Sequence, residues 1–356
     1  MSRGFFQQHT WLRFFYRQTQ RSGFTLLELL VAMVIGGIIS AGLLVLVVQL
    51  IQANSREAAR SDTQRDLQAA IDYIARDVRE AVYVYDGNCL LERPTGSTLE
   101  CPGLGRYLPE NISENASNTP VLAFWRVDAL PQILRDRCKN NADRFANPRD
   151  LPAEVRGVPC LSGRMYSLVV YSLNSEQTTG AVGRARIRRY ELPQFTAQGG
   201  AQIPPQINTG WVDPVSKETN FFSWPLNIST LTASSPLSLQ ASRPGRTTSN
   251  FVLTDFVDRI GLYDGAGNKA QPPILNGYEV TPRRESSASN EPPRGFYVYV
   301  KGTENKGALN QEVVIRIQGD AAGRPGVAGV NLARPVIPIS LETRVLTRGV
   351  TDKAAE

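Results

Sequence analysis

Residues 21–48 read RSGFTLLELLVAMVIGGIISAGLLVLVV, and this stretch decides the fold. From Leu29 to Val48 it holds 20 residues without a charged side chain, and only Ser40 is clearly polar. At about 1.5 Å rise per residue, such a helix spans roughly 30 Å, which is the thickness of a bilayer core. No other stretch of the sequence approaches this length. We therefore expect one membrane-spanning helix.

The flanks of the apolar stretch predict its orientation. Residues 1–23 contain four arginines and no Asp or Glu, so they account for four of the net +6 charges and leave +2 for the rest. Basic residues before the stretch, and few directly after it, place the N-terminus in the cytoplasm and the remaining chain on the far side. A cleaved secretory signal would have a shorter apolar core and a small-residue cleavage site, and Gln52–Asn54 is a poor one. A plain signal anchor remains an alternative.

The composition argues against two other classes of function, nucleic-acid binding and catalysis. No basic run of the length typical of nucleic-acid-binding patches is present, so we expect no nucleic-acid partner. The single histidine, His9, lies in the basic segment, so the rest of the chain lacks the usual general base and a common zinc ligand. Carboxylate chemistry stays possible. We expect no enzyme, no cofactor and no metal.

The four cysteines form no CxxC pair, which disfavours a zinc or redox site. An even number in an exported domain indicates disulfide bonds, and three pairings are possible. The pairing that closes the shortest loops joins Cys89 to Cys101 and Cys138 to Cys160. Four reduced, buried thiols would be expected if the domain were cytoplasmic.

Two residues argue against a plain anchor. Gly23 lies at the boundary between the basic and the apolar segments, and Glu28 lies at the start of the apolar run. A carboxylate buried without a partner in a membrane costs several kcal/mol, so Glu28 is a candidate functional residue. The alternative is a chance acidic residue that reaches toward solvent at the membrane edge.

Residues Arg21–Leu30, RSGFTLLELL, resemble the type IV prepilin cleavage and methylation motif. The resemblance implies that a prepilin peptidase cuts after Gly23 and methylates the new N-terminal residue, Phe24. It also implies that Glu28 is an assembly contact, which neutralises the charged amine of Phe24 in a neighbouring subunit. Many major pilins carry a kinking proline in this helix, and none occurs between Phe24 and Val82, which favours a minor pilin.

The helix is expected to continue beyond the membrane, because residues 52–82 contain no Gly or Pro. Apolar residues recur there at spacings of three and four, which predicts an amphipathic helix packed on a sheet, with a coiled coil as the alternative. This apolar stripe comprises Leu67, Ala70, Ile71, Ile74, Val78 and Ala81. The charged residues are expected on a solvated face or against filament neighbours: Arg56, Glu57, Arg60, Asp62, Arg65, Asp66, Arg76 and Asp77.

The remaining chain predicts a head domain built on an antiparallel sheet, because β-branched and aromatic runs alternate with turn signals. The expected architecture is α+β and pilin-like, a long N-terminal helix packed on this sheet. The domains are a cleaved leader (1–23), the helix (24–83, with 24–48 transmembrane) and the head (84–356), whose loop-rich insertions are 86–164 and 194–250. The expected strands are Val121–Val127, Tyr166–Leu173, Arg184–Leu192, Phe251–Tyr263, Gly295–Lys301, Gln311–Gln318 and Ile337–Thr347.

The size of the head, with Arg65–Ala70 (RDLQAA) and Arg76–Tyr83 (RDVREAVY), resembles the large minor pilins of the W/J type. It is also similar to the pseudopilins of hormogonium polysaccharide secretion in filamentous cyanobacteria. The resemblance implies a filament subunit that primes assembly or sits at the tip, in polysaccharide secretion and gliding motility. The implied partners are other pilins or pseudopilins, the prepilin peptidase and an inner-membrane assembly platform.

Other functions remain open from the sequence. The alternatives are an anchored enzyme that acts on polysaccharide, although no pair of carboxylates stands out, and an anchored glycan-binding module. Residues Asp264–Asn268 could line a calcium site, but the further ligands of an EF-hand loop are missing, so a plain turn is favoured.

Overall fold

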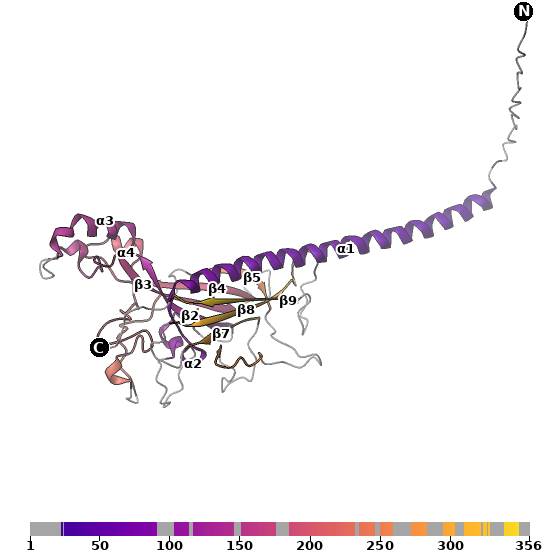
Figure 1. Ribbon diagram of the computed structural model, residues 1–356. Coiled ribbons are helices and arrows are strands. Elements are labelled where there is room, and N and C mark those ends of the chain that lie inside the picture. Colours follow the sequence, from indigo (N-terminus) through magenta and orange to yellow (C-terminus); the bar gives the residue numbers. More distant parts are fainter. Residues whose placement is uncertain are drawn as a thin grey trace, which may run out of the picture. The chain divides into compact units, whose positions relative to one another are not determined.

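The chain forms two compact units, Met1–Asn54 and Ser55–Glu356, and we call the second the head unit. The computed structural model (Figure 1) describes residues 23, 25–90, 103–113, 117–145, 151–175, 185–231, 235–245, 250–258, 272–282, 295–302, 310–321, 323–325, 327 and 338–348. The boundary between the units falls inside one helix, so the two parts of that helix belong to different units.

Helix α1 (Leu26–Arg79) is 54 residues long. Its sequence is rich in Leu, Ala, Arg and Gln, which are strong helix formers, and no Gly or Pro follows Gly42. The helix ends at Arg79 rather than at the expected residue 83, because Ala81–Val84 forms strand β1. The run Val82–Tyr85 alternates β-branched and aromatic residues, which fit a pleated sheet better than a helix.

The head unit contains a nine-stranded antiparallel sheet in the order β1-β2-β3-β4-β5-β8-β7-β6, with β9 paired to β8. The long helix followed by this curled sheet confirms the predicted α+β, pilin-like architecture. The strands after β1 are β2 (Asn118–Ala129), β3 (Arg164–Asn174), β4 (Ala185–Pro193), β5 (Asn250–Val257), β6 (Glu279–Thr281), β7 (Phe296–Lys301), β8 (Glu312–Asp320) and β9 (Pro338–Leu346).

The segment 86–164 holds more regular structure than its turn-rich composition predicts. Strand β2 extends well beyond the expected Val121–Val127, and pairing with β3 continues to Ala129. The segment also contains the short helices α2 (Gly87–Leu90) and α3 (Gln132–Asn140). Pairing with a long neighbour therefore extends β2 through Asn118, Pro120 and other residues of low strand propensity.

Hydrogen bonds between side chains and the backbone connect segments from the two ends of the sheet. The Gln311 side-chain amide accepts a hydrogen bond from the Val84 N–H at 2.7 Å and donates one to the Val84 carbonyl at 2.8 Å. The Thr281 hydroxyl, on β6, donates to the Val121 carbonyl on β2 at 2.6 Å. These bonds join segments more than 150 residues apart and hold the sheet in its curl.

The apolar stripe of α1 packs on one face of this sheet, as predicted. All six predicted residues are buried, although the last of them, Ala81, belongs to β1 rather than to the helix. The core that Leu67, Ile71, Ile74 and Val78 join includes side chains from β2, β3, β7 and β8. The helix comes close to the sheet over Gly319 of β8, where a Cβ atom would overlap Leu67 Cδ1. Glycine at this position therefore sets how near the helix can come to the sheet.

The other face of strands β1–β4 carries a second, aromatic core. Trp125 of β2 contacts Trp224 edge-on, with ring centroids 5.3 Å apart, and Phe221 lies beside both Trp125 and Tyr83. Trp224 and Phe221 belong to the irregular chain between β4 and β5, which contains the short helix α4 (Ala197–Ala201). Both faces of these strands are thus covered, which explains why their sequences are apolar on both sides.

A buried carboxylate, Asp77, fixes the C-terminal end of α1 to the sheet. Its two oxygens meet Arg126 of β2 at 2.5 Å and Arg189 of β4 at 2.7 Å. The Tyr171 hydroxyl of β3 donates a further hydrogen bond to Asp77 at 2.5 Å. The expectation that Asp77 lies on a solvated face is therefore wrong, because these partners compensate for its burial.

Two further carboxylates complete the charge balance around the arginines. Glu191 pairs with Arg189 at 2.5 Å and with Arg126 at 3.4 Å, while Asp128 pairs with Arg126 at 2.7 Å. Two guanidinium groups thus face three carboxylates, and the outer two of these are partly exposed.

The charges in this cluster reinforce one another. Burial opposes the charge on Arg189, but its hydrogen bond to Asp77 and the charge of Glu191 outweigh this effect and raise its pKa above the ordinary value. Burial and then the Asp77 carboxylate raise the pKa of the Tyr171 hydroxyl well above its ordinary value. The stability that Tyr171 contributes is therefore complete below about pH 10 and is lost as the pH rises beyond it.

Replacing Asp77 with Ala should destabilise the head unit by about 3–5 kcal/mol, because two arginines would stay buried without their shared carboxylate. Urea unfolding of the full chain in detergent, followed by tryptophan fluorescence, measures this loss. The exposed Asp62 on the same helix is the matched control, and D62A should change the stability by at most about 0.5 kcal/mol. Equal effects of the two substitutions would contradict the anchoring role.

Candidate processing and assembly site

The N-terminal end of α1 is shaped by Thr25, which directly precedes the helix. The Glu28 N–H donates to the Thr25 hydroxyl at 3.3 Å, and the Leu29 N–H donates to the Thr25 carbonyl at 3.2 Å. This is the forward half of a capping arrangement, in which a Thr side chain satisfies one of the unpaired N–H groups of the first turn. The motif therefore starts the helix two residues after the predicted cleavage position.

Glu28 lies in this first turn and its side chain is exposed. It forms no ion pair with any residue that the structure describes. The positive end of the helix dipole favours a carboxylate here. Glu28 thus places an exposed carboxylate, without an ion-pair partner in the described part of the chain, at the start of an apolar surface.

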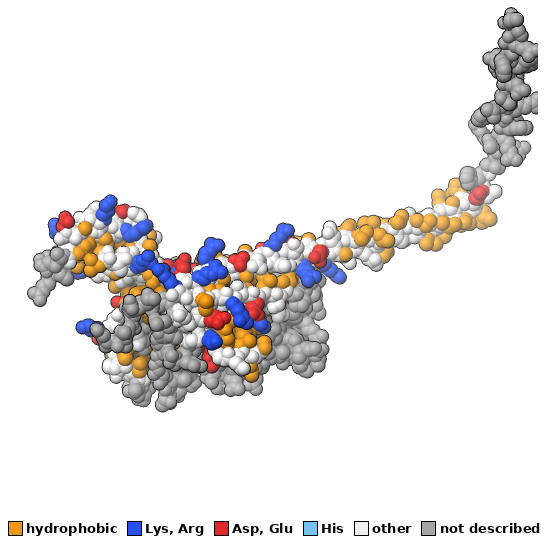
Figure 2. All heavy atoms as spheres, viewed as in Figure 1, with side chains coloured by type: hydrophobic (Ala, Val, Ile, Leu, Met, Phe, Trp, Pro, Cys, Tyr) orange, Lys and Arg blue, Asp and Glu red, His pale blue; other side chains and the backbone are white. Residues whose placement is uncertain are grey.

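The surface behind Glu28 is apolar on all sides. Within the first unit, every described residue is exposed, and large apolar side chains run from Leu26 to Ile51 (orange in Figure 2). In the described part of the chain, α1 is the one helix that is long and apolar enough to cross a membrane. A helix that is apolar all round is expected in lipid or inside a helical assembly.

Gly23 precedes Thr25 by two positions, and nothing lies within 4 Å of the place that its Cβ would occupy. The backbone at this candidate cleavage position is therefore accessible within the first unit. Phe24, the candidate methylated residue, lies outside the described residues.

A family model described as the prokaryotic N-terminal methylation motif matches residues 19–44. This match supports a type IV pilin or pseudopilin, the class that the motif RSGFTLLELL indicates. Searches of curated proteins and of solved structures gave no match. The fold, the exposed apolar helix and the motif agree on this class.

The motif carries further consequences for the chain. It implies processing by a prepilin peptidase and interaction with other pilins, and the apolar helix supports a single-pass membrane anchor. Proteins with this motif are structural subunits, which fits a role other than catalysis. Among the described residues, no group of three or more His, Cys, Asp or Glu side chains could hold a metal ion.

The structure joins Cys138 of α3 to Cys160 by a disulfide bond, with Cα atoms 5.4 Å apart. Cys89 of α2 is buried and also disulfide-bonded, while its expected partner Cys101 lies outside the described residues. The candidate calcium loop Asp264–Asn268 lies outside them as well. The cysteines are remote in sequence from the processing motif and belong to the head unit.

Two substitutions inside the apolar run, V34R and L44R together, should release the chain from membranes. Each charge near the middle of such a helix costs about 2.5–3.5 kcal/mol on insertion. Carbonate extraction of membranes, followed by immunoblotting, measures the retained fraction.

The control is the pair A53R and A58R, which adds the same charge to exposed positions of α1 after the run. This control should stay in the membrane fraction. Full retention of the V34R/L44R chain would contradict the spanning role of the helix.

Proposed function

We propose that this protein is a minor pilin or pseudopilin of a type IV pilus-like or type II secretion-like filament. A prepilin peptidase cuts after Gly23 and methylates Phe24, and the chain then enters the filament through α1. The observation that carries this proposal is the match to the methylation motif at the start of an exposed apolar helix.

The same helix surface serves two successive environments. Before assembly, the apolar residues from Leu26 to Ile51 lie in lipid, and after assembly they pack against the helices of neighbouring subunits. Gly36, Gly37 and Gly42 have open space around their Cβ positions, so these positions leave room for close helix approach. The apolar surface therefore stays covered throughout.

Glu28 has a specific role when the subunit passes from lipid into the filament. Cleavage creates a positively charged amine at Phe24, and moving it into an apolar filament core costs free energy unless an acidic group compensates it. The exposed carboxylate of Glu28 in a neighbouring subunit, which has no ion-pair partner among the residues that the structure describes, supplies that group. The pair sets the axial position of each new subunit.

The leader, residues 1–23, lies in the cytoplasm and the head unit lies on the opposite side of the membrane. The arginine-rich leader and the disulfide bond of the head support this orientation, because disulfides persist in oxidising compartments. The chain stays in the inner membrane until an assembly platform extracts it into a periplasmic or surface filament.

The size of the head supports a finer placement. A minor pilin of the W/J type primes assembly or caps the tip, where a bulky head meets few lateral neighbours. The head unit extends from Ser55 to Glu356, which is large for a subunit packed on all sides. The resemblance of residues 65–70 and 76–83 to pseudopilins of polysaccharide secretion supports a role of the filament in polysaccharide export and gliding motility.

An anchored glycan-binding module is the second candidate, and the aromatic core bears on it. The indole N–H groups of Trp125, Trp211 and Trp224 all donate to protein groups, at 2.9–3.0 Å. These rings form a core rather than an open sugar platform. A glycan site would therefore have to lie elsewhere on the head unit.

Replacing Glu28 with Ala should lower incorporation into sheared filaments by about tenfold or more, because the Phe24 amine would lack its partner. The measurement compares the filament and membrane pools by quantitative immunoblotting, in cells that express the remaining machinery. Processing at Gly23 should be unchanged.

Glu57 on the same helix is exposed and forms no described ion pair, so E57A is the matched control and should be incorporated normally. Normal incorporation of the E28A chain would remove the proposed contact. Loss of incorporation in both variants would show a general defect of the helix.

A further inference from the structure

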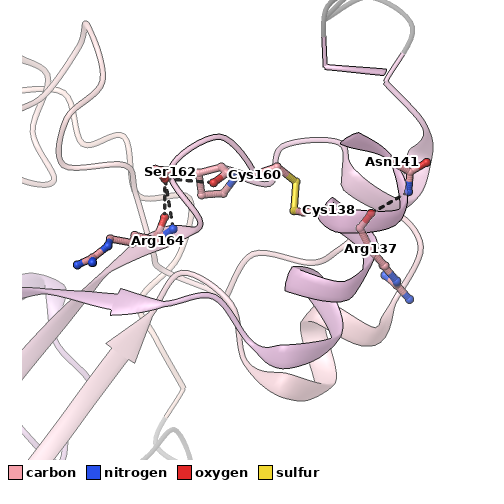
Figure 3. The surroundings of a disulfide bond; sticks show 7 residues. Arg137, Cys138, Asn141, Cys160, Ser162 and Arg164 are labelled. Atoms are coloured by element: carbon pink, nitrogen blue, oxygen red, sulfur yellow. Dashed lines mark hydrogen bonds between the residues drawn. A yellow bond between two sulfur atoms is a disulfide. The ribbon is translucent and has the colours of Figure 1, made fainter. Parts of the chain in front are cut away.

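A small substructure between β2 and β3 stands apart from the sheet, and we call it the disulfide lobe. It comprises residues 130–145 and 151–164, the last of which begins β3, together with residues 195–201, which include α4 (Figure 1). Leu134, Val155 and Phe195 form its own buried core. The disulfide Cys138–Cys160 ties α3 to the turn that leads into β3 (Figure 3).

Polar bonds hold the lobe in one arrangement. Arg137 of α3 donates to the backbone carbonyls of Gly200, Ala201 and Gln202 at 2.7–2.9 Å and so joins α3 to the end of α4. In the turn after the disulfide, the Gly163 N–H donates to the Pro159 carbonyl at 3.0 Å. The surface of the lobe is therefore preorganised, which lowers the entropic cost of binding.

The charge of the lobe is strongly unbalanced. Its described residues include six Lys or Arg side chains and three Asp or Glu side chains, a balance of +3. Figure 2 shows Lys and Arg side chains spread over this part of the surface. Five of the cations are exposed: Arg135, Lys139, Arg144, Arg156 and Arg164.

These five cations have no acidic partner among the residues that the structure describes. Three arginines of the sheet differ in this respect, since Arg126, Arg189 and Arg316 all pair with carboxylates. Asp136, the acidic residue beside Arg135, accepts a hydrogen bond from Gln132 at 2.8 Å instead. The positive charge of the lobe is therefore not neutralised by described residues of the fold.

The position of the lobe bears on what can reach it. Strand β2 passes Ala81 at Arg126 and enters the lobe after Ala129, so the lobe lies beyond the C-terminal end of α1 (Figure 1). The chain enters the head unit at Ser55, and α1 from there to Arg79 is roughly 36 Å long. This length exceeds the screening distance of about 8 Å in physiological salt. Salt would therefore screen the charges of the lobe from a partner bound near Ser55.

The number of exposed cations and the burial of the aromatic side chains bear on whether the lobe would bind a nucleic acid or a charged polysaccharide. Duplex DNA carries about one negative charge per 1.7 Å of its axis, and proteins that bind single strands combine a positive groove with aromatic side chains on which bases stack. The lobe has five exposed cations, and its described aromatic side chains, Phe145 and Phe195, are partly or fully buried. The modest number of cations suits a polymer of lower charge density, such as one that carries a single carboxylate on each sugar.

We propose that the disulfide lobe binds a carboxylated polysaccharide through Arg135, Lys139, Arg144, Arg156 and Arg164. The proposal rests on the proposed function in polysaccharide export and names the class of polymer that meets the subunit. The filament thereby contacts its cargo at the end of the head unit remote from Ser55.

The test uses the full, unprocessed chain in detergent, with polygalacturonate as the probe and dextran as its neutral counterpart. Polygalacturonate should bind and dextran should not, and binding should weaken about tenfold or more between 50 and 300 mM NaCl. The variant R135E/R156E/R164E reverses the lobe balance from +3 to −3 and should lower affinity at least about tenfold. An unchanged melting temperature and an intact Cys138–Cys160 bond show that the variant is folded.

The matched control R56E/R60E/R76E reverses three exposed arginines of α1 and should leave binding unchanged. Absence of polygalacturonate binding, equal loss in both variants, or equally tight binding of duplex DNA would overturn the proposal. The measurement does not depend on cleavage at Gly23, so a failure of processing would contradict the proposed function alone.

Discussion

The packing of the α1 stripe against the sheet is the contact on which the rest of the head unit depends. Leu67, Ile71 and Ile74 lie in the core that also collects side chains from most strands of the sheet. Gly319 admits the helix closely at one end of this contact, and Asp77 fixes it at the other through Arg126 and Arg189. The sheet can then curl round the helix, because Gln311 reaches across to Val84.

The two halves of α1 suit two different environments. Its first half is apolar on all sides and exposed within its own unit, which suits lipid or a bundle of like helices. Its second half is apolar on one side and carries charge on the other, which suits a helix laid on a sheet. The change occurs near Asn54, where the two units meet in sequence. The first half can thus occupy an apolar environment while the second half stays packed in the head unit.

Much of this plan could be predicted from the sequence because it follows from local periodicity. The uncharged run, the spacing of the stripe and the strands of the β7–β8 region all have short-range signals. The role of Asp77 could not be predicted, because Arg126 and Arg189 lie 49 and 112 residues away along the chain. The same holds for the five exposed cations of the disulfide lobe, because the sequence does not show that they have no acidic partner among the described residues. Thr25 could have been found, since Thr-x-x-Glu before an apolar run is a capping signal.

The central claim is that this chain is a prepilin whose α1 becomes a filament helix. The most direct test is the mass of the N-terminal peptide after co-expression of the full chain with a prepilin peptidase. The account predicts that residues 1–23 are absent and that the new N-terminus, Phe24, carries one methyl group, while a G23L chain keeps its leader. An intact, unmethylated N-terminus in the wild-type chain would contradict the account.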